Sequence, residues 1–427
     1  MKESLATVLE AVADLRADRT AVVQGGRARS WRELDDRAAR LAGYLAGTGA
    51  AADSRAGIAP QARVGIALPN SIEYLESLLA VLKLRAVPVN VNYRYRRDEL
   101  VHLFTDSRMQ ALVYDGRLEP QVAAAAQAAP ALRTLVRAGE RGGPWPGAGP
   151  EPGSFADALA APPLARLPRG DDHWLMYTGG TTGVPKGVLT RHSWLYQVVC
   201  ANGFGLLGRP VPGDLAGLRA AVAGGLAGPP AIVTLPASPL MHATGMYTCL
   251  GALVAGGEVI LLTSRSYDPH ELAAAIGRHR ADTLSLVGDA FARPLADALD
   301  EAAAAGRPYD LSSLRRILSV GVTWSADVKL RLLGHADVLC RDAIAASEGG
   351  PFAVCETRRG DDAVTSRFVL APGARVIDEH GRDVVPGSGA VGVLAAPAPP
   401  EISYQGDPAA SARTFRVIDG RRWSAPG

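Results

Sequence analysis

The sequence predicts an α/β protein with a parallel, doubly wound sheet and a smaller β-rich part at its C-terminal end. Short apolar runs alternate with helical patterns in the first third of the chain, and the same alternation returns between residues 267 and 320. Strands that alternate with helices form parallel sheets. From residue 363 onward, short strand-like runs are separated by Gly and Pro turns, which is typical of a small barrel or a distorted sheet. We expect α/β subdomains over residues 1–362 and a β-rich subdomain over residues 363–427.

The N-terminal elements follow from the spacing of apolar residues. Residues 5–15 and 31–45 have the helical spacing, and Ser30 with Glu33 three positions later forms a capping-box pattern before the second helix. The elements expected next are a strand at 64–68, a helix at 70–84, a strand at 86–91, a helix starting at 99 and a strand at 111–114.

The second half of the chain repeats this order. A helix is expected at 267–280, with strands at 283–287 and 314–320. Residues 137–170 and 209–230 are rich in Pro, Gly and Ala with weak periodicity, and we expect both to be irregular surface segments.

Composition excludes several classes of protein. The 427 residues suffice for more than one folding unit, and a net charge of +2 gives no reason to expect nucleic acid or an acidic membrane as a partner. The four cysteines have no metal-ligand spacing, which indicates reduced core thiols and a cytoplasmic location. No secretory signal pattern and no apolar run of about 18 residues is present, so we expect no integral membrane segment.

The chain is organised around the stretch Y-T-G-G-T-T-G-V-P-K-G-V at residues 177–188. An apolar run of strand type precedes it, and residues 189–199 have the character of a helix start. Gly residues let backbone N–H groups converge on an anion, Thr hydroxyls add donors, and Lys186 supplies a positive charge. This stretch therefore predicts a phosphate-binding loop. The alternative is a flexible Gly/Thr-rich surface hairpin.

This stretch closely resembles Y-T-S-G-T-T-G-x-P-K-G-V, the phosphate-binding signature of the adenylate-forming superfamily, which includes acyl- and aryl-CoA synthetases, luciferases and peptide-synthetase adenylation domains. One position departs, where Gly179 replaces serine. The resemblance implies two doubly wound subdomains plus a small β-barrel-like subdomain, and a catalytic role for Lys186. It assigns nucleotide contacts to Thr178, Gly179, Gly180, Thr181, Thr182, Gly183 and Lys186.

A second segment, P-L-M-H-A-T-G at residues 239–245, resembles the family pattern P-L-x-H-x-x-G, which opens a helix that lines the acyl pocket. The resemblance places His242 near the substrate carboxylate as a third candidate catalytic residue beside Lys186 and Glu348. A structural histidine is the alternative.

Two further segments resemble the nucleotide site. The glycine turn after the strand at 314–320 packs on adenine in the family, although a plain strand–helix turn is the alternative. The string D-A-I-A-A-S-E at 342–348 resembles Y-G-x-T-E with its metal-binding acid, although a surface acid in a Gly-flanked turn is the alternative. Mg²⁺ is held by few carboxylates plus phosphate oxygens, so Glu348 is assigned to Mg²⁺. The implied nucleotide contacts are Gly321, Val322, Thr323, Asp342, Ala343, Ile344, Ala345 and Ser347.

The C-terminal run at 421–427 resembles the start of the family pattern W-x-x-T-G-D. In the family, a small domain that carries a catalytic lysine follows this point, and here no lysine follows Lys329. We therefore expect the chain to be the AMP-binding N-terminal domain, without the C-terminal lid domain.

The segments together predict an AMP-forming acyl-CoA synthetase that uses ATP, Mg²⁺ and CoA. T-G-G-T-T-G, V-G-D-A-F-A-R-P at 287–294 and the C-terminal run most resemble the branch that acts on long-chain or steroid-side-chain acids. The expected partner is a small carboxylic acid, with a homodimer as one option for assembly. Two alternatives stay open: another oxyacid (such as nitrite) or a non-CoA acceptor, and a catalytically silent nucleotide-binding module, which Ala345 and the absent lysine favour.

Overall fold

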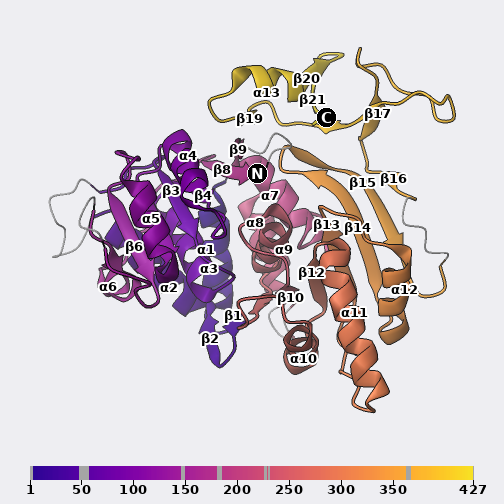
Figure 1. Cartoon of the computed structure of the whole chain (residues 1–427), viewed down its shortest axis with the longest axis horizontal. Helices are drawn as coiled ribbons and strands as arrows, with labels where there is room; N and C mark the ends of the chain where they lie inside the picture. Colours follow the sequence, from indigo (N-terminus) through magenta and orange to yellow (C-terminus); the bar gives the residue numbers. More distant parts are fainter. Residues whose placement is uncertain are drawn as a thin grey trace.

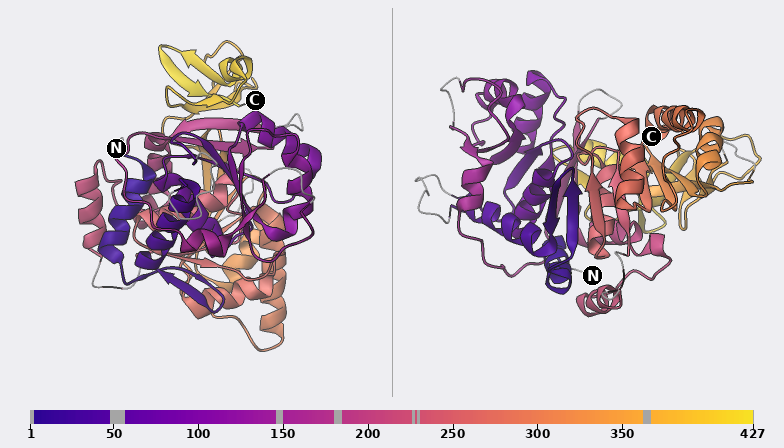
Figure 2. Two further views of the ribbon diagram at one scale, coloured as in Figure 1. Left: turned by 90° about the vertical axis from the view of Figure 1, so that its left-hand side faces the viewer. Right: turned by 90° about the horizontal axis from the view of Figure 1, so that it is seen from below.

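Two large sheets stand on either side of a shared layer of helices, and further helices cover the outer face of each sheet (Figure 1). Seen from below, the two halves lie side by side, with the C-terminal segment behind them (Figure 2). This arrangement confirms the predicted α/β class with two doubly wound halves. The computed structural model describes residues 3–47, 57–145, 150–179, 185–225, 228, 231–361 and 367–426.

The first sheet is parallel from β8 to β7, and its opposite edge is antiparallel because β9 folds back on β8 and β19 pairs with β9. In spatial order its strands are β19 (Ser403–Tyr404), β9 (Lys186–Arg191), β8 (His173–Thr178), β4 (Val87–Asn90), β3 (Arg63–Ala67), β5 (Ala111–Asp115), β6 (Thr134–Ala138) and β7 (Gly153–Ser154).

The second sheet is parallel from β14 to β1 and ends in antiparallel hairpins at both edges. In spatial order its strands are β16 (Val369–Leu370), β15 (Gly349–Thr357), β14 (Leu339–Ala346), β13 (Arg316–Val320), β12 (Thr283–Leu286), β10 (Val233–Pro236), β11 (Glu258–Leu261), β1 (Thr20–Gln24) and β2 (Arg27–Ser30).

Alternate residues of the strands enter different cores because successive side chains point to opposite faces of a sheet. In β8, Trp174 and Met176 face the core that both sheets share, and Leu175 and Tyr177 face the outer core. The shared core contains helices α1 (Leu5–Arg16), α2 (Trp31–Leu45), α3 (Ile72–Lys83), α6 (Phe155–Ala160), α7 (His192–Ala201), α8 (Leu215–Ala223) and α9 (Ala243–Val254). The outer layers contain α4 (Arg97–Ser107) and α5 (Glu119–Ala126), with the short 3₁₀ turn Gly116–Leu118, on the first sheet, and α10 (Pro269–His279), α11 (Gly288–Ala304) and α12 (Ala326–His335) on the second.

The C-terminal segment crosses the top of the molecule over the junction of the two sheets (Figure 1). Its four antiparallel strands form a third sheet, in the order β17 (Arg375–Ile377), β18 (Val393–Pro397), β21 (Arg421–Ser424) and β20 (Phe415–Ile418), and α13 (Pro408–Thr414) precedes β20. One short strand expected in this β-rich part, at residues 366–370, pairs elsewhere, because its described end β16 joins the second sheet. The strand β19, which was not predicted, extends the first sheet. Ser366, expected in the same strand as β16, lies outside the described residues.

Most predicted elements are confirmed, including the capping box of Ser30 and Glu33. The irregular segment expected at 137–170 contains β7 and α6, and Ser154 caps this helix. The helix expected over residues 189–199 is wrong in its first part, because β9 occupies residues 186–191 and α7 begins at His192. Val188 and Thr190 are buried on alternate positions of β9, a strand pattern that the short window concealed. The irregular segment expected at 209–230 contains α8, which Asp214 caps and which packs on α1.

All four cysteines are free and buried, as the sequence predicts. Among the helices in the described part of the chain, none has the length and apolar character needed to cross a bilayer.

Candidate active site

The phosphate-loop stretch connects two antiparallel strands. Thr178, the last residue of β8, pairs with Lys186, the first residue of β9, so the loop between them is the tip of a hairpin. The element that follows the loop is therefore the strand β9 and not a helix. Four predicted contact residues, Gly180, Thr181, Thr182 and Gly183, lie outside the described residues.

Helix α4 supports this hairpin from the outer side of the sheet. His102 Nε2 donates a hydrogen bond to the carbonyl oxygen of Pro185 over 3.1 Å. The hydroxyl of Tyr177 donates to the carboxylate of Asp106 on the same helix. Burial and this hydrogen bond raise the pKa of Tyr177, so its hydroxyl keeps its proton and stays a donor. Both ends of the loop are thus anchored.

Asn90 connects the phosphate hairpin to the segment before His242. Its Nδ2 donates to the carbonyl oxygens of Tyr177 (2.9 Å) and Met241 (2.7 Å), and its Oδ1 accepts from the Tyr177 N–H (2.7 Å). The residue is buried at the end of β4, where its side-chain amide takes the place of a backbone peptide group beside β8. The main chain next to Thr178 and the main chain next to His242 therefore have one common support.

Glu348 lies at the turn between β14 and β15, where the second sheet reaches the first. One carboxylate oxygen, Oε1, accepts a hydrogen bond from the Tyr404 hydroxyl over 2.8 Å. The Nζ of Lys186 lies 5.4 Å from the centre of the Tyr404 ring. Glu348 and Lys186, predicted from segments 162 positions apart, therefore contact the same side chain.

The described lysines differ in their surroundings. Lys83 is buried in ion pairs with Glu10 and Asp35, whereas Lys186 is half-buried at the loop with its ammonium over the Tyr404 ring. A cation held by an aromatic face keeps its charge and its hydrogen-bond donors for a phosphate.

Asp342 is placed differently from the expectation. Its carboxylate forms a buried ion pair with Lys329 of α12 over 3.3 Å, and burial raises the pKa of Asp342. Ala343 and Ala345 line the site cavity, so by strand alternation Asp342 and Ile344 lie on the opposite face. A nucleotide contact by the Asp342 carboxylate would require this ion pair to break.

A cavity of about 350 Å³ extends from the loop into the shared helical layer. Its polar end is formed by the two hairpins and the end of β13, and its other end is formed by α7 and α9. The lining includes Thr178, Gly179, His242, Gly321, Ala343, Ala345 and Ser347 from the predicted site, and Trp194, Val198, Ala201, Leu206 and Tyr247 on the apolar side.

His242 is the residue before α9 and is exposed toward this cavity. Removal of its ring from bulk water and the nearby positive charge of Arg94 lower its pKa below the ordinary value, so the imidazole is neutral at pH 7. Gly245, one turn into the helix, allows close packing, since a Cβ there would lie 2.6 Å from the carbonyl oxygens of Ser238 and Pro239.

The predicted adenine turn is only partly in the cavity. Gly321, with φ +112°, lines it. Val322 and Thr323 pack against Gly288 at the start of α11, where a Cβ would come within 2.4 Å of the Thr323 carbonyl oxygen. Of the three predicted residues of this turn, Gly321 alone is among the cavity lining, and Val322 and Thr323 are not.

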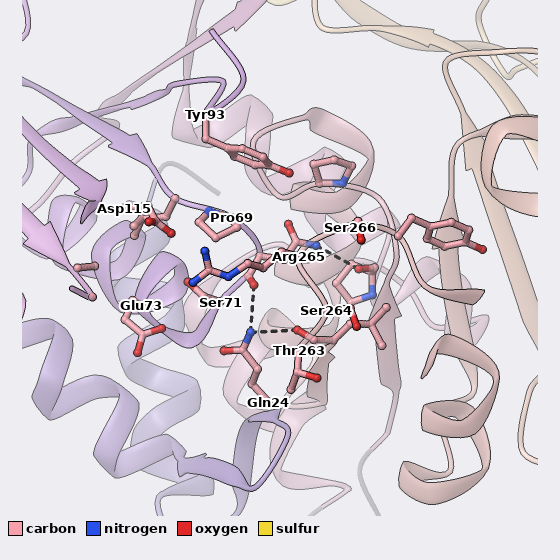
Figure 3. Close-up of a pocket in the computed structure, with 18 of the residues that line it drawn as sticks. Gln24, Pro69, Ser71, Glu73, Tyr93, Asp115, Thr263, Ser264, Arg265 and Ser266 are labelled. Carbon is pink, nitrogen blue, oxygen red and sulfur yellow. Dashed lines mark hydrogen bonds between the residues drawn. The ribbon is translucent and has the colours of Figure 1, made fainter. Parts of the chain in front are cut away.

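A second cavity of about 380 Å³ opens between the two halves of the molecule (Figure 3). Tyr93, Asp115 and Glu73 lie on one side in this view, and Thr263 to Ser266 lie on the other. Gln24 ties the two sides together, because its Nε2 donates to the carbonyl oxygens of Asn70 and Leu262. Four arginines line the cavity, namely Arg27, Arg94, Arg117 and Arg265.

The two cavities are separated by a single turn. Pro239 lines the second cavity and His242 lines the first, and the His242 N–H donates to the Pro239 carbonyl oxygen over 3.1 Å.

The sequence interpretation missed Asn90 and Tyr404. Asn90 is a polar residue in the otherwise apolar run V-P-V-N-V, which was the available signal. No role was predicted for Tyr404, because its partners Glu348 and Lys186 are distant in sequence.

The family is decided by comparison with known proteins. The family model described as AMP-binding enzyme matches residues 9–397. The chain belongs to the AMP-binding enzyme family. A medium/long-chain-fatty-acid–CoA/3-oxocholest-4-en-26-oate–CoA ligase of Mycolicibacterium smegmatis is 34% identical over the whole chain and 76% of its own length. A 3-oxocholest-4-en-26-oate–CoA ligase of Rhodococcus rhodochrous is 32% identical, over 100% of the chain and 75% of its own length.

Two solved structures show the same fold. The anthranilate CoA ligase AuaEII in complex with anthranoyl-AMP superposes with a TM-score of 0.78 at 20% identity, over the whole chain and 78% of its own. The N-terminal subdomain of Klebsiella oxytoca NpsA gives 0.72 at 15% identity, over 99% of the chain and 95% of its own. Together with the relatives, the family confirms the predicted class of reaction: ATP-dependent activation of a carboxylic acid and transfer to CoA.

Proposed function

We propose that this chain activates a medium- or long-chain fatty acid, or a steroid-side-chain acid, as its adenylate for transfer to CoA. The observation that carries the proposal is the single cavity whose polar end contains Thr178, Gly179 and Ser347 and whose apolar end contains Trp194 and Leu206. An acid with an alkyl or steroid body fills both ends at once. Nitrite would leave the apolar end empty, and the named substrates of the relatives agree with the larger acid.

The triphosphate is assigned to the hairpin tip. Thr178, the loop and Lys186 supply hydroxyl, backbone and ammonium donors for the β- and γ-phosphates. Glu348 fits Mg²⁺, because it is a half-buried carboxylate beside Lys186 with one oxygen already held by Tyr404, and Mg²⁺ takes one or two carboxylates plus phosphate oxygens. When bound, the ion neutralises charge on the phosphate oxygens.

In this proposal adenylate formation involves no covalent bond between the protein and the substrate. The substrate carboxylate attacks the α-phosphorus, the bond to pyrophosphate breaks, and the acyl-adenylate forms. The side chains hold two anions together and stabilise charge as it moves onto the leaving group. In this proposal His242, neutral at pH 7, donates a hydrogen bond to the carboxylate without forming an ion pair with it.

CoA is assigned to the second cavity. Its diphosphate and 3′-phosphate require cationic partners, and four arginines line this cavity. Arg117 and Arg27 are held by Asp115 and Glu73. Arg94 lies against the Tyr93 ring at 5.7 Å and close enough to His242 to lower its pKa. The thiol would then reach the adenylate past the turn at 239–242.

Arg94→Ala is expected to weaken CoA binding by about 10-fold, the effect of losing one charge-assisted phosphate contact. Calorimetry with CoA on the chain saturated with a non-hydrolysable acyl-adenylate measures this directly. Arg94→Lys should recover part of the affinity, and because it keeps the positive charge near His242, its acid-dependent ATP–pyrophosphate exchange should stay near the wild-type rate. Unchanged CoA affinity in Arg94→Ala would remove CoA from this cavity.

The function itself is tested by acid-dependent ATP–pyrophosphate exchange with fatty, steroid-side-chain and aryl acids plus nitrite. Binding of the corresponding acyl-sulfamoyl adenosines, measured by calorimetry, gives a readout that needs no turnover. We expect exchange and tight binding with the alkyl and steroid acids. A response confined to aryl acids or nitrite would overturn the substrate class, and ATP binding with no response to any acid would favour a silent module. The cytoplasmic location and the homodimer stay predictions.

A further inference from the structure

Tyr404 occupies a position that the assigned chemistry does not use. It belongs to the two-residue strand β19, which comes from the C-terminal segment yet pairs with β9 of the first sheet, Tyr404 opposite Val188. Its neighbour Gln405 donates a backbone hydrogen bond to the Gly187 carbonyl oxygen over 2.7 Å. The strand thus places the Tyr404 side chain next to Lys186.

The side chain itself is held from several directions. The Tyr404 N–H donates to Ser411 Oγ over 2.9 Å, and the ring lies 5.6 Å from the ring of Phe415. Val188, Ile402 and Phe415 form a small apolar cluster against which the ring packs. A ring restrained in this way can fix the groups that it touches.

The two groups that it touches come from different sheets. Its hydroxyl donates to Glu348 Oε1 of the β14–β15 turn, and its face lies under Lys186 Nζ of the β8–β9 hairpin. A hydrogen bond to one carboxylate oxygen orients the carboxylate and leaves the other oxygen for a metal, which is how outer partners tune metal ligands. The ring face keeps the ammonium close to the loop without neutralising it.

We infer that Tyr404 is a positioning residue that sets the geometry between the metal-binding carboxylate of Glu348 and the phosphate-binding ammonium of Lys186. The inference rests on the proposed function. The two contacts can be tested separately, because the hydroxyl donates a hydrogen bond to Glu348 and the ring face contacts the ammonium of Lys186.

Two variants separate the two contacts. Tyr404→Phe removes only the hydroxyl, and we expect the Mg²⁺ concentration that half-saturates ATP binding to rise by roughly 10-fold or more, as for loss of an outer partner of a metal ligand. Its affinity for ATP in EDTA should be unchanged. Tyr404→Leu also removes the ring, and we expect a loss of ATP affinity in EDTA as well. Calorimetric titrations of ATP, with Mg²⁺ varied and with EDTA, measure both quantities without turnover.

Two controls give the result its meaning. Tyr309→Phe also loses one tyrosine hydroxyl hydrogen bond, to His270 at 3.0 Å, and should bind Mg²⁺ and ATP like the wild type. Binding of an acyl-sulfamoyl adenosine, which lacks β- and γ-phosphates, should be equal in all variants and reports that the site is folded. If the wild type shows no Mg²⁺-dependent ATP binding, the proposed function fails. If it does and Tyr404→Phe has the same Mg²⁺ half-saturation, the inference about Tyr404 is overturned.

Discussion

Replacing Glu348 by glutamine is expected to lower acid-dependent ATP–pyrophosphate exchange by about 100-fold or more, because the change removes the charged oxygen assigned to Mg²⁺. The amide has the same shape, so the turn between β14 and β15 should keep its conformation. The Tyr404 hydroxyl can still donate to the amide oxygen. The loss should therefore appear in the Mg²⁺-dependent part of ATP affinity and in the exchange rate, not in the free energy of unfolding.

Comparing the binding of two ligands, ATP and an acyl-sulfamoyl adenosine, separates the effect of the metal from other effects of the substitution. ATP binding should lose most of its Mg²⁺ dependence in Glu348→Gln, whereas an acyl-sulfamoyl adenosine should bind as in the wild type. Glu379→Gln, which removes a carboxylate that is 86% exposed in a turn of the C-terminal segment, should leave both measurements unchanged. Near-normal exchange by Glu348→Gln would withdraw the metal assignment.

Replacing Asn90 by leucine is expected to lower the free energy of unfolding by about 3 kcal/mol, because it leaves buried backbone groups without partners. The groups are the N–H and the carbonyl of Tyr177 and the carbonyl of Met241. Exchange should fall by about 10-fold or more at temperatures where the variant is still folded, since shifts near 1 Å in positioning groups are costly. Urea unfolding gives the first value, and exchange well below the melting transition gives the second.

Asn92 provides the matched control for stability. It lies two residues further on, is half-buried, and accepts one hydrogen bond from the Arg94 N–H over 2.9 Å. Asn92→Leu should therefore cost less than about 1 kcal/mol. If Asn90→Leu is destabilised no more than Asn92→Leu and retains full exchange, the bridge between the hairpin and His242 has no energetic role.

The sequence predicted the elements and the site from local signals. Helical spacing, a capping box and buried strand runs place α1, α2 and the elements from β3 to β5 within a few residues, because each depends on neighbours in the chain. The hairpin of β1 and β2 was not predicted. The Gly/Thr-rich stretch and the acid after Ser347 identified the two charged sides of the site for the same reason. Their proximity to each other was implied only by resemblance to the family.

What the sequence did not show depends on contacts between distant segments. The sequence does not indicate that Lys329 and Asp342 are partners. In the fold they form an ion pair, and the Asp342 carboxylate is directed away from the cavity. β19 has two residues and no pattern of its own, so its pairing with β9 could not be predicted. The strand β9 was not predicted, because its short alternating pattern is followed directly by α7 and together they resemble the start of one helix.

The two ends of the site cavity have different origins, and this affects how such a protein can evolve. The apolar side chains Trp194, Val198 and Ala201 lie at positions i, i+4 and i+7 of α7 and face the cavity together. The phosphate end is fixed by the pairing of Thr178 with Lys186 in another element. A few codon changes within one helix can therefore redirect the chain toward a new acid while the machinery for activating it is inherited intact, so divergence in substrate does not have to pass through an inactive ancestor.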